Sequence, residues 1–358
     1  MEQVPVIREY GRGDKEGVFA LKEAVDGSSF DEQLWNWKFG SGAIRAAKLY
    51  VAESRGMIVG LRAFIIEELK VIDELWLSGL GVDTMVHPDF RRCGIAATMA
   101  QEGFRRMGEE GMPILLSFPN DVAFKVYSRK RPYWRHICSV PLLAKPLNVD
   151  NILRGYIRNP FLRRLTNLPV KAALKVLSRS KLSKSEDLLL RKVDVFDSQF
   201  DNFWERASKQ YDIGVVRDRK FLNWRFVDKP GDGYSIFSAE RGEEIQGYIV
   251  LKNAEMFGLR LGLIVDILTV GEDSIADSLL AEAIDYFTEM KIEVIGCLML
   301  KHAPYFRALR KAGFISVPKM LVRKEFYFGV QVRPSVLPDQ IVNDPSNWFL
   351  TWADIDIV

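Results

Sequence analysis

Residues 82–97 decide the fold, and they read VDTMVHPDFRRCGIAA. An apolar strand pattern is followed by a proline, two arginines and a glycine, and then a helix with an apolar stripe begins. The first turn of a helix has free amide groups at the positive end of its dipole, so it attracts anions. Gly94 lets the backbone approach a ligand closely, and Arg91 and Arg92 add positive charge. The stretch therefore predicts a phosphate-binding loop between a strand and a helix.

The spacing within this loop is specific. Arg91, Gly94 and Ala96 occupy the fixed positions of the pattern Q/R-x-x-G-x-G/A. The glycines of a dinucleotide fingerprint and the lysine of a Walker loop are absent. The stretch resembles the pyrophosphate loop of the GCN5-related N-acetyltransferase (GNAT) superfamily, which implies acetyl-CoA as co-substrate. The residues that the resemblance assigns to CoA are Met85, Val86, Arg91, Arg92, Cys93, Gly94, Ile95, Ala96, Asn120 and Tyr127.

A second part of the resemblance lies downstream of the loop. A buried strand over residues 112–118 leads through Asn120 into a helix over residues 122–130, for which Asp121 is the expected cap. In the GNAT superfamily the two strands splay apart around the thioester arm, and a tyrosine on this helix protonates the leaving thiolate. Tyr127 falls at that position, and a phenol can donate a proton to a thiolate. The alternative role of Tyr127 is core packing beside Phe124.

Two further residues near the loop are candidates for chemistry. Asp83 is an acid within an apolar strand, where a carboxylate is costly unless it is paired. It is either the general base that takes the proton of an acceptor amine or a hydrogen-bonded structural residue. Asp266, at the corresponding place in the second half of the chain, favours the structural role. Cys93 lacks the basic neighbour that a nucleophilic cysteine requires, so we expect it only to fill the loop.

The chain repeats one plan. Residues 34–39 and 221–226 are similar Trp-containing segments, and Trp35 and Trp37 are better explained as core anchors than as an acceptor platform. Each segment is followed by a hairpin, a strand with one acid, a long helix, a buried strand and a short helix. A repeat of this length indicates duplicated domains.

The repeat predicts an α/β fold with two tandem GNAT-like domains, each a mixed, mostly antiparallel sheet flanked by helices. We expect a catalytic, acyl-CoA-binding domain over residues 1–145 and a degenerate domain over residues 191–358, with residues 317–358 closing the second sheet. The second copy has Glu272 and Asp273 in place of the arginines, and Leu309 in place of the tyrosine. Those acids would repel a pyrophosphate.

Residues 146–190 form a basic segment between the two copies. Their apolar residues are spaced for short amphipathic helices, which predicts a helical connector with a solvated basic face. A membrane surface or an acidic partner is the alternative.

Composition limits the function classes. The 358 residues carry a net charge of +3, which does not favour nucleic acid as a partner, and no apolar run is long enough to span a membrane. Three dispersed cysteines and three histidines without ligand spacing argue against disulfides and against a metal site. Without a secretion signal at the start of the chain, a cytoplasmic location is expected.

These observations predict an acyl-CoA-dependent N-acyltransferase, specifically an N-acetyltransferase, that moves an acetyl group to a primary amine by direct attack. The resemblance is to bacterial two-domain members, which implies a small acceptor such as an amino sugar and a monomer or homodimer. One alternative is a Fem-type transferase that takes its acyl group from charged tRNA, although such enzymes usually lack the pyrophosphate loop. Another is a non-catalytic CoA-binding sensor or scaffold, for which a proton donor would have no use.

Overall fold

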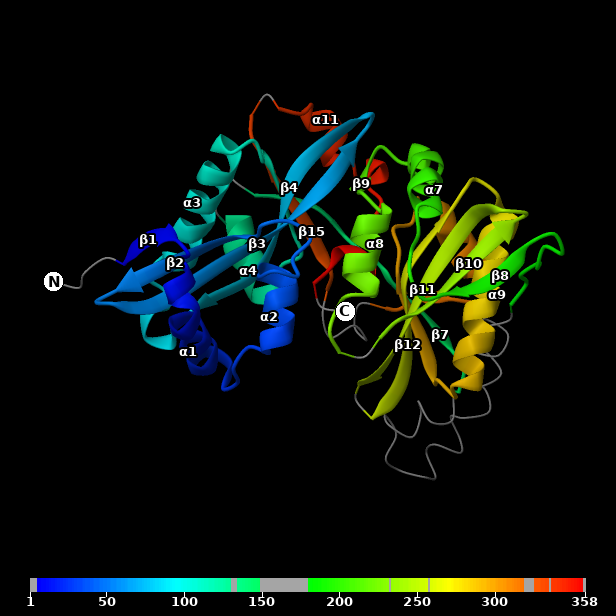
Figure 1. The fold of residues 1–358 in the computed structure, drawn as a ribbon, viewed down its shortest axis with the longest axis horizontal. Coiled ribbons are helices and arrows are strands. Elements are labelled where there is room, and N and C mark those ends of the chain that lie inside the picture. The colour runs from blue at the N-terminus through cyan, green and yellow to red at the C-terminus, as the bar shows by residue number, and fades with distance from the viewer. Residues whose placement is uncertain are drawn as a thin grey trace. The chain divides into compact units, whose positions relative to one another are not determined.

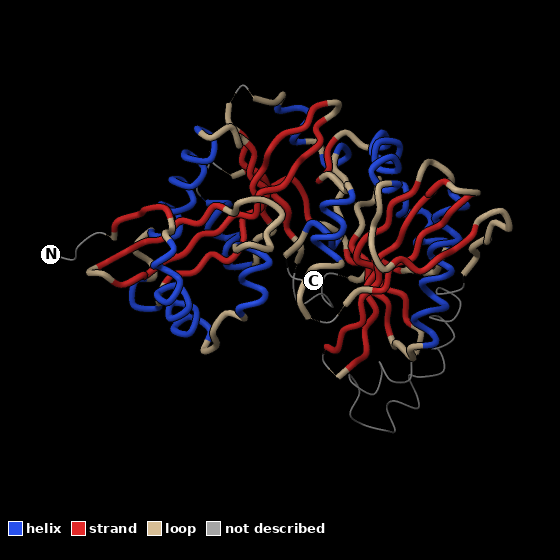
Figure 2. Tube along the Cα trace, in the orientation of Figure 1, coloured by secondary structure: helices blue, strands red, loops and turns tan. Residues whose placement is uncertain are grey.

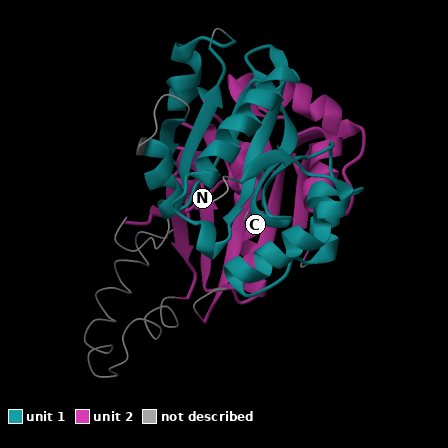
Figure 3. Ribbon diagram, turned by 90° about the vertical axis from the view of Figure 1, so that its left-hand side faces the viewer, with its two compact units in different colours: residues 1–139, 228–231, 326–347 teal, residues 140–227, 232–325, 348–358 magenta. Residues whose placement is uncertain are grey.

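The computed structural model describes residues 5–129, 134–148, 180–231, 233–256, 258–318, 325–334 and 336–356. The expected helices of the basic connector lie almost entirely outside these residues. Figures 1 and 2 show an α/β chain with two mixed sheets flanked by helices, as the sequence predicted. The chain divides into two compact units, coloured separately in Figure 3. Unit 1 comprises residues 1–139, 228–231 and 326–347, and unit 2 comprises residues 140–227, 232–325 and 348–358.

The sheet of unit 1 has the strand order β1-β2-β3-β4-β5-β15-β6. Its neighbouring strands are antiparallel except for β4 and β5, which are parallel. The strands are β1 (Val6–Glu9), β2 (Lys48–Ser54), β3 (Met57–Val71), β4 (Glu74–Val86), β5 (Ile114–Ser117), β6 (Arg135–Ser139) and β15 (Tyr327–Val332). The helices are α1 (Lys15–Asp26), α2 (Glu32–Phe39), α3 (Ile95–Glu109), α4 (Asp121–Arg129) and α11 (Asp339–Asn343).

The sheet of unit 2 has the order β14-β7-β13-β12-β11-β10-β8. Its strands are β7 (Leu142–Pro146), β8 (Leu189–Val193), β10 (Ser235–Arg241), β11 (Glu244–Met256), β12 (Leu259–Thr269), β13 (Val294–Leu298) and β14 (Ile315–Ser316). Its helices are α7 (Gln199–Ala207), α8 (Arg219–Phe226), α9 (Asp273–Glu289) and α10 (Pro304–Lys311), and β9 (Ile213–Val215) is a short strand. The succession from α8 to α10 repeats that from α2 to α4, so the structure contains the two copies that the sequence indicates.

Each sheet takes one strand from the other half of the sequence. In unit 1, β15 pairs with β5 from Gly329↔Ser117 to Val332↔Ile114 and so separates β5 from β6. In unit 2, β7 pairs with β13 in the corresponding place. The expected boundary at residue 145 therefore differs from the structure, and the expectation that residues 317–358 close the second sheet is wrong for β15. The reason is that β5 has a backbone edge that needs a ladder of hydrogen bonds, and a distant segment supplies it.

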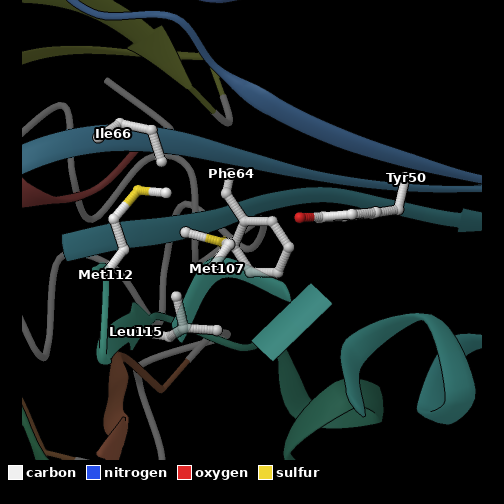
Figure 4. Packing of buried hydrophobic residues seen from close by; sticks show 6 residues of the cluster. All are labelled: Tyr50, Phe64, Ile66, Met107, Met112 and Leu115. Carbon is white, nitrogen blue, oxygen red and sulfur yellow. The ribbon is translucent and has the colours of Figure 1, made fainter. Parts of the chain in front are cut away.

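Apolar side chains between the C-terminal half of α3 and the sheet form one cluster of the core. Figure 4 shows this cluster, which consists of Tyr50, Phe64, Ile66, Met107, Met112 and Leu115, all buried. Helix α3 approaches the sheet closely because it has Gly103, where a Cβ atom would lie 2.8 Å from the ring of Phe64. The predicted anchors Trp35 and Trp37 are only 5% and 4% exposed. A second buried cluster, formed by Ala52, Val59, Ile95 and Met99 with Val86 packed against it, holds the start of α3 against the carboxyl end of β4.

Candidate active site

The predicted phosphate loop joins β4 to α3, and its residues 91–94 are exposed. Gly94 is the N-cap of α3 and adopts the left-handed conformation, with φ of +80°. Glycine tolerates this conformation, and it has no side chain to occupy the free amides of the first helical turn. Arg92 is also left-handed, with φ of +68°. The helix therefore presents its amides and its positive dipole end to solvent beside two arginines, an arrangement that suits a pyrophosphate.

Of Met85 and Val86, both of which the resemblance assigns to CoA, strand β4 directs only one backbone amide toward the candidate site. The His87 amide donates to the Val59 carbonyl on β3 at 2.9 Å. Backbone groups of a strand point alternately to its two neighbours, so the Val86 amide is directed away from β3 and the Met85 amide toward it. The Val86 carbonyl lies on the same edge as its amide and accepts a hydrogen bond from Arg91 Nε at 3.3 Å. Val86 is thus better placed than Met85 to contact a thioester oxygen.

An opening lies beyond the paired part of β4 and β5. The two strands pair from Ser78↔Ile114 to Gly81↔Ser117, and β4 continues to Val86 after β5 has ended. A cavity of about 40 Å³ lies beside this opening. Its lining residues are Arg62, Ala97, Ala100, Gln101, Leu115, Leu116, Ser117, Val126, Tyr127, Trp134 and Gln331. The geometry matches the expected splay of two parallel strands beside the phosphate loop.

Tyr127 lies on α4 and lines this cavity. Its hydroxyl accepts a hydrogen bond from Arg62 Nη1 at 3.2 Å, and its ring centroid lies 5.7 Å from that of Trp134. Phe124 instead stacks on Tyr327 of β15 at 3.8 Å. Tyr127 therefore has a polar contact and faces the cavity, whereas Phe124 anchors α4 to the sheet.

Asn120 caps the helix that carries Tyr127. Its side-chain oxygen accepts a hydrogen bond from the Ala123 amide at 2.9 Å, and its carbonyl accepts one from Phe124 at 2.8 Å. The expected cap, Asp121, is instead the first residue of the helix. Asn120 thus has a structural role, in addition to the contact with CoA that the sequence resemblance assigns to it.

Arg62 was not among the residues that the sequence singled out. It lies on β3, is only 5% exposed, and reaches both Thr84 on β4 and Tyr127 on α4. The available signal was its position as the single charge in the apolar run of residues 58–66. A charge within such a run is costly unless it has a partner or a function.

Asp83 lies at a β-bulge, because Asp83 and Thr84 together oppose Arg62 in the pairing of β4 with β3. Its φ is +44°, and its carboxylate pairs with Lys38 Nζ of α2 at 3.0 Å. The side chains of Asp83 and Lys38 are only 24% and 16% exposed. This ion pair favours the structural one of the two predicted roles, since the carboxylate already holds α2 to β4 through Lys38.

The cysteines show no sign of nucleophilic chemistry. Cys93 is exposed in the loop, and its thiol lies 3.6 Å from the Arg91 carbonyl. Burial raises the pKa of the Cys138 thiol to about 12, which keeps it protonated at neutral pH. Within the described ranges, no group of three histidine, cysteine or carboxylate side chains could hold a metal ion.

The corresponding loop of unit 2 has a different electrostatic character. Glu272 is the N-cap of α9, Asp273 begins the helix, and Glu272 pairs with Arg241 at 3.0 Å. Leu309 is fully buried where the first copy has Tyr127. Asp266 is buried too and accepts a hydrogen bond from Tyr248 at 2.7 Å. Unit 2 therefore lacks the cationic loop and the candidate proton donor.

Comparison with known proteins agrees with this geometry. Residues 6–131 match the family described as acetyltransferase (GNAT) domain. The N-terminal part of the chain is thus similar to a GNAT domain, and the two sheets of the chain fit a tandem of GNAT-like domains. A search of curated proteins gives no significant sequence match.

Several solved structures share the fold over most of both chains. A probable N-acyltransferase from Enterococcus faecalis has a TM-score of 0.64 and 9% identity, with 92% of this chain and 73% of that one covered. A GCN5-related N-acetyltransferase from Anabaena variabilis has a TM-score of 0.61 and 11% identity, with coverage of 92% and 72%. The N-myristoyltransferase of Saccharomyces cerevisiae, solved with bound myristoyl-CoA, has a TM-score of 0.57 and 12% identity, with coverage of 92% and 83%. At these identities the comparison establishes a shared fold.

No helix in the part of the chain that the structure describes is both long and apolar enough to cross a membrane.

Proposed function

We propose that this protein is an N-acetyltransferase of the GNAT superfamily that moves the acetyl group of acetyl-CoA to a primary amine of a small molecule, such as an amino sugar. The observation that carries the proposal is that the free amides of the first turn of α3 and Tyr127 lie at one opening of unit 1. The free amides alone would suit any phosphate ligand. A phenol that lines the adjacent cavity adds the proton donor that release of a thiol needs.

The proposed reaction is direct transfer. The pyrophosphate of acetyl-CoA binds the amides at the start of α3 together with Arg91 and Arg92, and the thioester lies in the opening between β4 and β5. The Val86 amide stabilises the oxygen of the tetrahedral intermediate, because it is directed toward that opening. The amine attacks the carbonyl carbon and loses its surplus proton to water, the carbon–sulfur bond breaks, and Tyr127 protonates the sulfur and regains a proton from water. No covalent enzyme intermediate is required.

The cationic loop and Tyr127 also favour this proposal over its two alternatives. A transferase that uses charged tRNA has no need of a pyrophosphate site, and a CoA sensor has no need of a proton donor.

The test is a transfer assay that measures thiol release from acetyl-CoA with a panel of primary amines, using the wild type and Tyr127→Phe. We expect Tyr127→Phe to lower kcat by about 100-fold, the usual contribution of a general acid, with an unchanged dissociation constant for acetyl-CoA. Tyr286→Phe on α9 removes a hydroxyl that bonds Ser235 at 2.8 Å in unit 2, and it should leave kcat unchanged. A Tyr127→Phe enzyme with full turnover would remove the proton-donor assignment.

A further inference from the structure

Arg62 is a buried guanidinium at the centre of the candidate site. Its side chain is carried by β3 and extends across β4, and it lines the cavity together with Tyr127. Strand β4 leaves room for it at Gly81, because a Cβ atom there would lie 2.2 Å from Arg62 Nη2 and 2.9 Å from Cζ. The guanidinium therefore occupies a space that any other residue at position 81 would obstruct.

The contacts of Arg62 leave its charge without a counterion. Its Nη1 atom donates to the Thr84 hydroxyl and, at 3.2 Å, to the Tyr127 hydroxyl, and its Cζ atom lies 4.7 Å from the centroid of the Phe64 ring. Its Nε atom is buried and has no hydrogen-bond partner among the described residues, and none of their carboxylates pairs with it. A buried cation without a counterion costs free energy. Such a cost indicates a function in which negative charge forms beside the group.

The two copies differ both at the position of Arg62 and at the position of Gly81. Ile249 of β11 is the equivalent of Arg62, because each residue lies the same number of positions after the pair that closes the first hairpin of its copy. The pairs Phe64↔Gly81 and Leu251↔Ile264 place Ile264 at the position of Gly81. Both isoleucines are buried, with at most 1% exposed. The copy without the phosphate loop and the tyrosine thus fills with apolar atoms the place where the first copy holds a guanidinium.

We propose that Arg62 is a positioning residue that acts through Tyr127 in the acyl-transfer step. The inference rests on the proposed function. The guanidinium occupies a lone pair of the phenolic oxygen, so the O–H hydrogen of Tyr127 is left to point at the departing sulfur. As the N–C bond forms and the C–S bond breaks, the sulfur receives the electron pair and takes the proton from Tyr127. The phenolate that remains is stabilised by the adjacent cation until water returns a proton, and the surplus proton of the amine passes to water.

A double-mutant cycle tests this role. The variants are Arg62→Met, Tyr127→Phe and the combination of both, each measured for kcat and, by calorimetry, for affinity toward acetyl-CoA. We expect Arg62→Met to lower kcat about 10- to 100-fold while the affinity changes less than about threefold. In the Tyr127→Phe background, Arg62→Met should change kcat by less than about twofold, because both residues serve one proton transfer. Losses that multiply in the double variant, or an unchanged kcat in Arg62→Met, would refute the proposal.

Matched variants separate this role from a role in folding. Gly81→Ala keeps the arginine but displaces its guanidinium, and it should lower kcat as Arg62→Met does. Arg106→Met removes an arginine of α3 that pairs with Glu102 at 2.7 Å outside the cavity lining, and it should leave kcat unchanged. Thermal melts followed by circular dichroism establish that each variant is folded, and if Arg62→Met does not fold, Gly81→Ala decides alone.

The inference and the proposed function fail in different ways. If the wild type neither binds acetyl-CoA nor releases thiol, the proposed function fails. If the wild type is active and Gly81→Ala and Arg62→Met both retain its kcat, only the role of Arg62 fails.

Discussion

Asp83 combines an unusual backbone conformation with an ion pair. Its φ of +44° lies in the left-handed region, where aspartate and asparagine are several-fold enriched among non-glycine residues. Its carboxylate contacts Lys38 Nζ at 3.0 Å. The residue type therefore suits the bulge in β4 that turns Thr84 toward Arg62, independently of any role in proton transfer.

Substitution of Asp83 separates the two roles. Asp83→Asn keeps the tolerance for positive φ but removes the charge, and we expect kcat to fall less than about tenfold, with a loss of about 1 kcal/mol in the free energy of unfolding from the lost ion pair. Steady-state kinetics and urea unfolding measure the two effects. A loss of about 1,000-fold in kcat without a change in stability would instead identify Asp83 as the general base.

Single residues were predictable where a local pattern specifies them. The glycine of the loop before α3 follows from the motif, and the two core tryptophans follow from the repeat. Arg62 could not be predicted in this way, because its role depends on Gly81 and Tyr127, which lie far from it in the sequence. The cap of α4 was placed one residue too late, since Asn120 and Asp121 are both good caps and only the geometry distinguishes them.

Helix α4 holds Tyr127 at the cavity and depends on the Asn120 cap. Asn120→Ala removes an N-terminal hydrogen bond that contributes about 1 kcal/mol, so we expect that loss in the free energy of unfolding. We also expect a lower kcat, because the first turn of α4 lies next to the turn that carries Tyr127. Asn120→Asp retains a capping oxygen and should preserve the free energy of unfolding. Equal stability of the wild type and Asn120→Ala in urea unfolding would show that the cap is dispensable.

Elements with strong local periodicity were predicted in both copies. The hairpins, the long helices α3 and α9, and the buried strands β5 and β13 all appear where the patterns indicate them. The sheet membership of β15 and β7 was not predictable. A strand pattern indicates which residues are extended but not which distant edge they join.

The strand exchange makes unit 1 dependent on the C-terminal half of the chain. A fragment of residues 1–145 lacks β15, which covers the edge of β5 from Ile114 to Ser117. We expect this fragment to aggregate or to lack a cooperative unfolding transition, because the exposed edge and the apolar residues beneath it would be uncovered. Size-exclusion chromatography and circular dichroism melts provide the measurement.

A matched fragment controls for chain length. Residues 1–145 joined through a flexible linker to residues 326–347 restore the strand order of unit 1 and should recover a cooperative transition. If the shorter fragment were monomeric and cooperatively folded, β15 would not be needed for the sheet.

The most direct test of the account is calorimetric titration of acetyl-CoA into the wild type, Gly94→Glu and Gly271→Glu. The two glycines are left-handed, with φ of +80° and +66°, and both precede long helices in equivalent loops, so the variants share the same strain and the same added charge. We predict micromolar binding by the wild type, undiminished binding by Gly271→Glu, and no binding by Gly94→Glu. Binding that Gly94→Glu retains, or no binding by the folded wild type, would contradict the assignment of the loop at α3 to the pyrophosphate of acetyl-CoA.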